Sequence, residues 1–381
     1  MNTTEATATA AELALFRDAV RRFVETELAP HEARWRAQQH VDRAAWRKAG
    51  DMGLLLCAVP AALGGVGADM RHEAVVYEEL ARGGAMGFGK HVHEIVAHYL
   101  VGYGTAEQQG RWLPRMASGE AIAAIAMSEP GAGSDLQGIR TRAIRDGGDY
   151  VISGSKTFIS NGHIADLVLL VCKTDPQAGA KGTSLIMIET PALPGFRRGR
   201  ILDKIGQKAQ DTAELFFDDV RVPVANLLGG DEGRGFAQLM QQLPFERTII
   251  ALTAVAVIER AVELTAAYVK ERRAFGKALI EMQNTRFKLA ECQTVARVAR
   301  VFVDDCVRRL MDGTMDATTA SMAKWWTTEM QCQVVDECLQ LHGGYGYMLD
   351  YPIAQMYADS RVQKIYGGTN EIMKELIARS L

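Results

Sequence analysis

The sequence predicts a mainly helical α+β protein in which a small β-domain lies between two helical domains. Three observations predict this arrangement. Apolar residues recur at helical spacing within residues 1–120, short apolar runs separated by Gly and Pro fill residues 121–228, and long amphipathic segments occupy residues 229–381. Because no helical pattern separates the short runs, a doubly wound nucleotide-binding fold is disfavoured.

The first 120 residues predict a helical domain. Apolar side chains recur at helical spacing near its start, namely Leu13, Phe16, Val20, Phe23 and Val24. Thr105 to Gln108 resembles a capping box at the start of a later helix. Residues 81–99 are mostly apolar and predict helix, with breaks at the glycines of 83–84 and 87–89.

Residues 121–228 predict short strands. The segment 145–149, Arg-Asp-Gly-Gly-Asp, is a turn signal between two candidate strands. After the apolar run 121–127, the other candidate strands are 151–152, 158–159, 167–171, 185–188, 214–217 and 220–222. Many short strands within about a hundred residues are typical of a small sandwich or barrel.

Residues 229–381 predict a four-helix bundle, because long helical patterns follow one another with short connections. Residues 246–273 contain neither Pro nor Gly and are amphipathic, as are residues 279–311. Asp316 is a candidate cap for a third helix that ends near residue 341. Pro352 is expected to begin a fourth helix, and Asn370 to cap a last short one.

Composition and charge exclude several classes of function. The 43 basic and 46 acidic residues give a net charge of −3, which does not indicate nucleic-acid binding. The longest apolar runs are far shorter than the ~20 residues of a membrane span. His93 and His98 are five residues apart and would diverge on a helix, so no metal site is expected. The N-terminus lacks the features of a targeting peptide, and we expect a bacterial cytoplasmic protein.

The strongest motif is Ala-Met-Ser-Glu-Pro-Gly-Ala-Gly-Ser-Asp at residues 126–135. Its glycines leave backbone N–H groups open to an anion or a polar ring edge, although a purely structural turn is an equal alternative. In this order the ten residues resemble the acyl-CoA dehydrogenase signature. The resemblance implies FAD contacts for residues in and just before this segment, namely Ile125, Met127, Ser128, Gly133 and Ser134, with Ser134 also on the substrate side.

Four further motifs share the resemblance, which extends from Phe16 to about Arg379. In residues 154–162, Phe158 would lie against the isoalloxazine ring and Ser160 would bond near N5, with Ile159 between them; many members have Trp and Thr there. Arg272, Phe275 and Gln283 would reach the pyrophosphate and adenosine half of the FAD in a neighbouring subunit. The segments 340–346 and 365–371 resemble the two C-terminal motifs, which would place Gln340, Gly343, Gly344, Thr369 and Glu371 at the cofactor.

The resemblance implies a fold, a reaction and partners. FAD would lie between the β-domain and the C-terminal helices and be completed by an adjacent protomer, usually in a homotetramer. A carboxylate would remove the α-proton of an acyl-CoA thioester while the β-hydride moves to flavin N5. The electrons would then pass to electron-transferring flavoprotein.

The usual catalytic glutamate is missing, because its position holds Gly367. Either the chain is inactive, or the carboxylate comes from elsewhere. Isovaleryl-CoA and long-chain acyl-CoA dehydrogenases place a Glu, followed by Arg, near the start of the first C-terminal helix. Glu246 and Arg247 stand at that place, and a Gly367 without a side chain leaves room for Glu246. The alternatives are a first-turn acid favoured by the helix dipole for Glu246, and a surface arginine for Arg247.

The resemblance also implies how the substrate is held. The backbone N–H of Gly367 and the flavin ribityl hydroxyl would stabilise the enolate oxygen, and one such donor is worth ~10²–10³ in rate. Phe245, Arg247 and Gly368 are further candidates for substrate contact. A Glu246 carboxyl in an apolar cleft should have a raised pKa.

The C-terminal stretch, residues 317–379, most resembles long-chain acyl-CoA dehydrogenases, so a long-chain saturated acyl-CoA is the first candidate substrate. A branched-chain or short-chain acyl-CoA dehydrogenase and a non-catalytic acyl-CoA-binding protein are the alternatives. We expect the pocket floor near residues 87–97. His91, His93 and Glu94 are unusually polar there and either face solvent or shorten or specialise the pocket.

Overall fold

The computed structural model describes residues 9–381. Its N-terminal domain consists of helices α1 (Ala10–Phe23), α2 (Glu32–Gln38), α3 (Arg43–Asp51), α4 (Met70–Arg82), α5 (Lys90–Tyr103) and α6 (Ala106–Ala117). The predicted capping box is confirmed, since the Thr105 hydroxyl accepts the Gln108 N–H and the Gln108 side chain accepts the Thr105 N–H. The predicted breaks are also present, because α4 ends at Arg82 and α5 begins at Lys90.

The middle of the chain forms a seven-stranded sheet. Its strands are β1 (Ala123–Ala126), β2 (Arg142–Asp146), β3 (Asp149–Ser160), β4 (Leu167–Lys173), β5 (Thr183–Glu189), β6 (Phe196–Ile201) and β7 (Thr212–Pro223). The order is β1-β4-β2-β3-β7-β6, and β5 pairs with the other edge of β4. β1 and β2 run parallel to β4, whereas the other pairs are antiparallel.

The strand boundaries differ from the predicted ones for a physical reason. Residues 151–152 and 158–159 belong to the single strand β3, and residues 214–217 and 220–222 belong to β7. The register of the β3–β7 pair shifts between Ile152 and Gly154 and again between Lys156 and Ile159. Such irregularities interrupt the apolar alternation, so one bent strand resembles two short ones. Strand β6, Phe-Arg-Arg-Gly-Arg-Ile, carries too few apolar residues to be predicted.

The C-terminal domain consists of α7 (Gly235–Glu271), α8 (Gln283–Met311), α9 (Ala317–His342), α10 (Pro352–Ser360) and α11 (Asn370–Ala378). A hairpin of β8 (Arg273–Ala274) and β9 (Lys277–Ala278) joins α7 to α8. Asp316 caps α9 and Pro352 begins α10, as predicted. Thr369, rather than Asn370, caps α11 through its side chain.

Helix α7 corrects one interpretation of Glu246. The helix begins at Gly235 and contains Pro244, so Glu246 lies well inside it and is not a first-turn acid. The sequence suggested a later start because Pro is usually tolerated only in the first turn of a helix. A dipole effect, which is confined to the terminal turns, therefore does not account for this residue.

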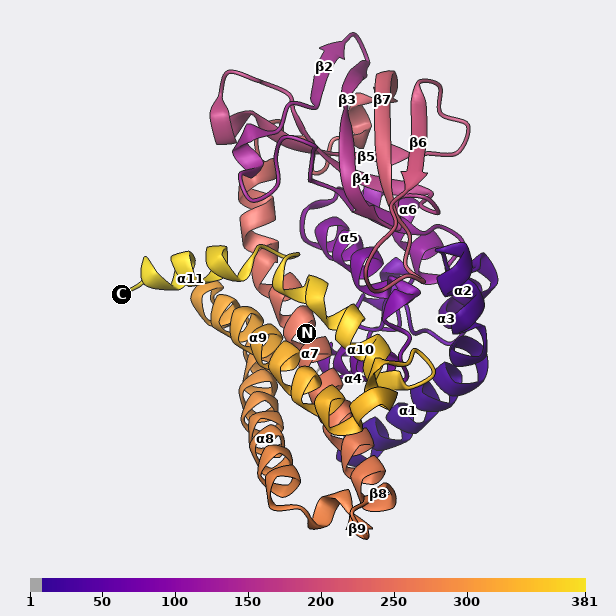
Figure 1. Ribbon diagram of the computed structural model, residues 1–381. Helices are drawn as coiled ribbons and strands as arrows, with labels where there is room; N and C mark the ends of the chain where they lie inside the picture. The colour runs from indigo at the N-terminus through magenta and orange to yellow at the C-terminus, as the bar shows by residue number, and fades with distance from the viewer. Residues whose placement is uncertain (1–8) are drawn as a thin grey trace.

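The three domains are stacked so that the sheet lies at one end of the molecule (Figure 1). Helix α5 contacts β1 beneath the sheet, α4 packs against α7, and the β8–β9 hairpin lies at the far end of the helical bundle (Figure 1). Within residues 9–381, no helix has the length and apolarity needed to cross a membrane.

Candidate active site

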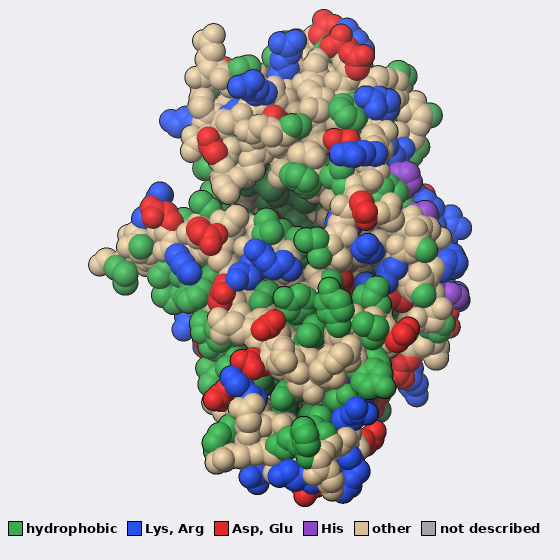
Figure 2. Space-filling model, in the orientation of Figure 1, with side chains coloured by type: hydrophobic (Ala, Val, Ile, Leu, Met, Phe, Trp, Pro, Cys, Tyr) green, Lys and Arg blue, Asp and Glu red, His purple; other side chains and the backbone are tan. Residues whose placement is uncertain are grey.

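A hollow lies between the β-domain and the helices below it, and hydrophobic side chains are exposed inside it (Figure 2). One face of α7 borders this region. Ile249, Ile250 and Thr253 line a cavity, and Glu246 lies on the same face of the helix, one turn before Ile249 and Ile250 and two turns before Thr253. Helical periodicity therefore places a carboxyl at one end of a row of cavity-lining side chains.

The Glu246 side chain is buried, with only 6% of its surface exposed. The Tyr99 hydroxyl, from α5, donates a hydrogen bond of 3.0 Å to its Oε1. Burial raises the pKa of Glu246 to about 7, and the Tyr99 hydrogen bond and the Arg247 charge only partly oppose this. A carboxyl with a pKa near neutrality is suited to proton transfer at physiological pH.

Arg247 is also buried, so its interpretation as a surface arginine is wrong. Its Nη1 donates to the Ser321 hydroxyl at 3.1 Å, and its Nε donates to the Gly367 carbonyl at 3.5 Å. Gly367 has φ +65°, and a Cβ built there would lie 2.5 Å from Cδ1 of Ile250. Arg247 thus ties α7 to the 367–368 turn, and Ile250 fills the space that a side chain at position 367 would need.

The 126–135 segment and strand β3 are joined by direct hydrogen bonds. The Thr157 N–H donates to the Ser128 carbonyl at 3.0 Å. Lys156 Nζ donates to the Met127 carbonyl and to the Glu129 carboxylate, both at 2.9 Å. Two motifs that are about thirty residues apart in the sequence therefore form one surface.

This surface has room for a flat ligand. Phe158 is 70% exposed and has a positive φ of 60°, which a bulky residue rarely adopts away from a functional site. A Cβ added to Gly131 or Gly133 would meet no atom of residues 9–381 within 4 Å, apart from its chain neighbours. Ser134 is exposed and Ser160 is half-buried beside Phe158.

One of the predicted FAD contacts on this surface, Ile159, cannot offer its side chain to a ligand. The side chain of Ile159 is 2% exposed and belongs to the apolar core of the β-domain. Only its backbone can therefore contact a ligand. Ile125, within β1, and Met127, directly after it, are half-buried.

Comparisons with known proteins point to the same family for all three domains of the chain. Family models for the N-terminal, middle and C-terminal domains of acyl-CoA dehydrogenase match residues 10–120, 124–220 and 233–381. The chain is 50% identical over 370 residues to the mouse mitochondrial long-chain specific acyl-CoA dehydrogenase, covering 96% of this chain and 86% of that one. This chain belongs to the acyl-CoA dehydrogenase family.

Two further relatives support the assignment. An acyl-CoA dehydrogenase of Bacillus subtilis is 36% identical over 97% of this chain and 98% of its own. A crystal structure of an acyl-CoA dehydrogenase from Geobacillus kaustophilus superposes with a TM-score of 0.94 at 48% identity, covering 98% of each chain. As a member of this family, the protein is a flavin-dependent oxidoreductase.

The remaining FAD motifs of the acyl-CoA dehydrogenase resemblance do not meet this surface. Arg272, Gln340, Gly343 and Gly344 instead surround a separate cavity of about 480 Å³. It lies at the end of α7, next to the β8–β9 hairpin and far from the sheet (Figure 1). Phe275, in that hairpin, is 93% exposed, and Gln283 is exposed at the start of α8. The predicted cofactor residues described so far thus form two separate groups, one on the β-domain and one beside the β8–β9 hairpin (Figure 1).

The last motif lies beside Arg247. Thr369 caps α11, and Glu371 is exposed in its first turn. A Cβ on Gly368 would lie 3.9 Å from the Arg247 guanidinium, so this motif continues the turn that Arg247 holds. Phe245 is buried and its ring stacks on His98, with 3.7 Å between the ring centroids.

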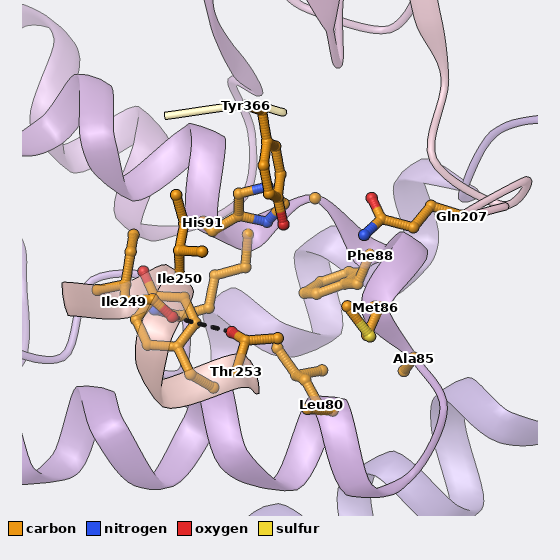
Figure 3. Close-up of a pocket in the computed structure, with 14 residues that line it drawn as sticks. Leu80, Ala85, Met86, Phe88, His91, Gln207, Ile249, Ile250, Thr253 and Tyr366 are labelled. Carbon is orange, nitrogen blue, oxygen red and sulfur yellow. Dashed lines mark hydrogen bonds between the residues drawn. The ribbon is translucent and has the colours of Figure 1, made fainter. Parts of the chain in front are cut away.

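The cavity beside Glu246 is lined by residues that are distant in the sequence (Figure 3). It is narrow, about 30 Å³, and is lined from α4, α5, α7 and three connecting segments. His91 lines it, whereas His93 and Glu94 are buried away from it. Of the two alternatives left open for these residues, exposure to solvent is therefore wrong for His93 and Glu94, and His91 lines the cavity. The His93 ring is hydrogen-bonded to the Ala123 N–H and lies 3.1 Å from the Met116 carbonyl.

Several site residues were not found from the sequence. Tyr99 and Gln207 come from different segments and carry no local motif, and Tyr366 lies within the 365–371 motif but was not singled out, so only the folded chain brings them to the site. The row of Ile249, Ile250 and Thr253 could have been found by extending helical spacing from Glu246.

Proposed function

We propose that this protein catalyses the FAD-dependent α,β-dehydrogenation of a long-chain acyl-CoA to a trans-2-enoyl-CoA and passes the electrons to electron-transferring flavoprotein. The observation that carries the proposal is Glu246, a buried carboxyl with a pKa of about 7, one helical turn before Ile249 and Ile250, which line a mostly apolar cavity. The 50% identity to a long-chain specific relative supports the substrate class.

The residues present fit FAD. The open glycines of the 126–135 segment and the exposed Phe158 offer a face for a planar ring, with Ser128, Ser134 and Ser160 as polar partners. When bound, FAD supplies the acceptor for the hydride that leaves the β-carbon of the substrate.

Glu246 supplies the base in this proposal. Its carboxylate takes the α-proton, and the Tyr99 hydroxyl stabilises the charged carboxylate by donating to Oε1. The N–H of Gly367 is the donor for the thioester oxygen, and Arg247 holds that turn through the Gly367 carbonyl. Burial excludes water, which strengthens each of these polar interactions.

The two separate groups of cofactor residues support a homotetramer. Arg272, Gln340 and Gly343 surround a cavity at the far end of α7, away from the sheet that holds Phe158, and we infer that the two groups of one chain do not share one FAD (Figure 1). A second copy would bring its own Arg272 group to the FAD held by the first.

An anaerobic titration of the FAD-loaded enzyme with a series of saturated acyl-CoA thioesters tests this function. We expect the oxidised flavin absorbance to bleach most readily with long chains. A preference for short or branched chains, which the narrow cavity would favour, supports dehydrogenation but overturns long-chain specificity. Absence of bleaching with every thioester would identify a non-catalytic acyl-CoA-binding protein and contradict the proposal.

A further inference from the structure

The wall of the cavity beside Glu246 carries a polar atom that a saturated chain cannot satisfy. His91, in the first turn of α5, lines the cavity, and its Nε2 is buried without a hydrogen-bond partner among residues 9–381. Burial lowers the pKa of His91 to about 4, so the ring is neutral at physiological pH. A buried polar atom left without a partner is costly, and each such atom in a native fold calls for an explanation.

The position of His91 relates it to the reacting end of the substrate. Its ring lies edge-on to that of Tyr366, with 6.2 Å between the centroids. Tyr366 directly precedes Gly367, the proposed donor to the thioester oxygen. Figure 3 shows His91, Tyr366 and Ile250 grouped on one side of the cavity, with Gln207 and Phe88 on the other.

Gln207 is a second polar side chain held in this wall. Its backbone N–H donates to the Asp359 carboxylate, and its side-chain Nε2 donates to the Asp359 carbonyl at 3.4 Å. The residue is 5% exposed and has a positive φ of 46°. Two bonds to α10 and an unusual backbone conformation thus fix an amide opposite the imidazole.

The cavity wall is also charged beyond His91. Lys90 and Tyr77 line the cavity, and both are almost fully buried. Lys90 Nζ lies 2.5 Å from Glu73 Oε2, contacts Glu94 and sits 4.4 Å from the centre of the Tyr77 ring. The Tyr77 hydroxyl donates to Glu94. Glu73 and Glu94 do not line the cavity themselves but neutralise Lys90 from behind it, so this side of the cavity is backed by a buried ion cluster rather than by hydrocarbon alone.

We propose that this cavity selects an acyl chain that carries an oxygen substituent beyond the β-carbon, and that His91 is the specificity-determining residue that hydrogen-bonds it. A hydroxyl is the best fit, because it can donate to or accept from Nε2 in either tautomer of the neutral ring. The proposal rests on the acyl-CoA dehydrogenation proposed above and narrows its substrate class.

The test compares decanoyl-CoA with a series of hydroxydecanoyl-CoA thioesters whose hydroxyl moves from the γ-carbon to the ω-carbon. We expect one position to give a kcat/KM about tenfold above that of decanoyl-CoA, because the orphaned ring nitrogen gains its partner. The preference should be confined to one or two adjacent carbons, since His91 is fixed on a helix. An equal or higher kcat/KM for decanoyl-CoA against every hydroxylated chain overturns the proposal.

Two variants of His91 assign the effect to its ring nitrogen. His91→Phe should abolish the preference and leave the ratio of the two kcat/KM values near one, whereas His91→Asn, which keeps a polar group, should retain part of it. Flavin content and melting temperature report whether each variant folds. If His91→Phe binds FAD and keeps the native ratio, the proposal is wrong.

His98→Phe is the matched control. His98 lies on the same helix and also has an Nε2 without a hydrogen-bond partner in the described chain, but it does not line the cavity. We expect this variant to leave the ratio unchanged; an equal loss of preference would contradict the role of His91. Failure of the dehydrogenation itself is distinguishable, because no thioester of either kind would then bleach the flavin.

Discussion

At the scale of single residues, the site depends on groups held in unfavourable surroundings. Glu246 is buried with one hydrogen bond from Tyr99, Phe158 is exposed in a strained conformation, and Gly367 adopts φ +65°. Proteins tolerate such features at functional sites and compensate for them elsewhere. They are the residues at which structure and function are most closely linked.

The pKa of Glu246 predicts the pH dependence of the reaction. Since the base must be ionised, the rate of flavin reduction should rise with pH through about 7. Tyr99→Phe removes a hydrogen bond that lowers this pKa, so the midpoint of the profile should move to higher pH. Stopped-flow reduction by decanoyl-CoA across pH measures both profiles, and an unchanged midpoint in Tyr99→Phe would contradict the assignment.

The same carboxyl should lower the stability of the fold at neutral pH. Its pKa in the folded protein, about 7, exceeds the usual value near 4.5, so the unfolded chain releases the proton first and stability falls as pH rises between these values. Glu246→Gln should therefore be more stable than the native protein above pH 7, by about 1–3 kcal/mol. The difference should shrink towards pH 4, and denaturant unfolding at both pH values measures it. If Glu246→Gln is less stable than the native protein at high pH, burial of the ionised Glu246 carboxylate does not destabilise the fold.

At the scale of elements, the sequence predicts those that have strong local signals. Thr105, Asp316 and Pro352 mark helix starts by chemistry that acts within one turn. Helix α7 and strand β3 were misjudged because tertiary packing overrides a local break, at Pro244 and at the β3 irregularities. The contacts between Arg247 and Gly367, and between Thr157 and Ser128, join segments that are distant in the sequence. They therefore cannot be predicted from the local spacing of residues.

The cap of α9 provides a test of this local chemistry. The Asp316 carboxylate accepts hydrogen bonds from the N–H and the hydroxyl of Thr319, at 2.8 and 2.6 Å. Asp316→Ala should lower the free energy of unfolding by about 1 kcal/mol, the usual value of an N-cap. Asp336→Ala, at an exposed position within the same helix, is the control and should change stability little. Equal denaturant midpoints for the two variants would show that the cap does not stabilise the fold.

At the scale of the whole molecule, the sequence predicted the family and its three-part fold, but not how the cofactor motifs are distributed. Motifs along a chain do not reveal that strand β3, which holds Phe158, lies apart from the far end of α7, which Arg272 follows (Figure 1). That separation is a property of the assembled tertiary structure. It is also the observation on which the proposed homotetramer rests.

Arg272→Ala tests this arrangement. We expect the purified variant to lose FAD on gel filtration even though Arg272 is far from Phe158 in its own chain. Arg273→Ala, at the neighbouring exposed arginine, should retain the cofactor and serves as the control. Light scattering gives the oligomeric state of each variant, and a native protein that is monomeric with FAD fully bound would contradict the proposed assembly.

The central claim is that Glu246 replaces the glutamate missing at position 367, and its most direct test is the rate of flavin reduction in Glu246→Gln. Glu271→Gln, at the exposed end of the same helix, is the matched control. Anaerobic mixing with decanoyl-CoA should reduce the Glu246→Gln flavin at least about a hundredfold more slowly than in the native enzyme and in the control, with FAD still bound. Reduction of Glu246→Gln at a near-native rate would show that another group removes the α-proton.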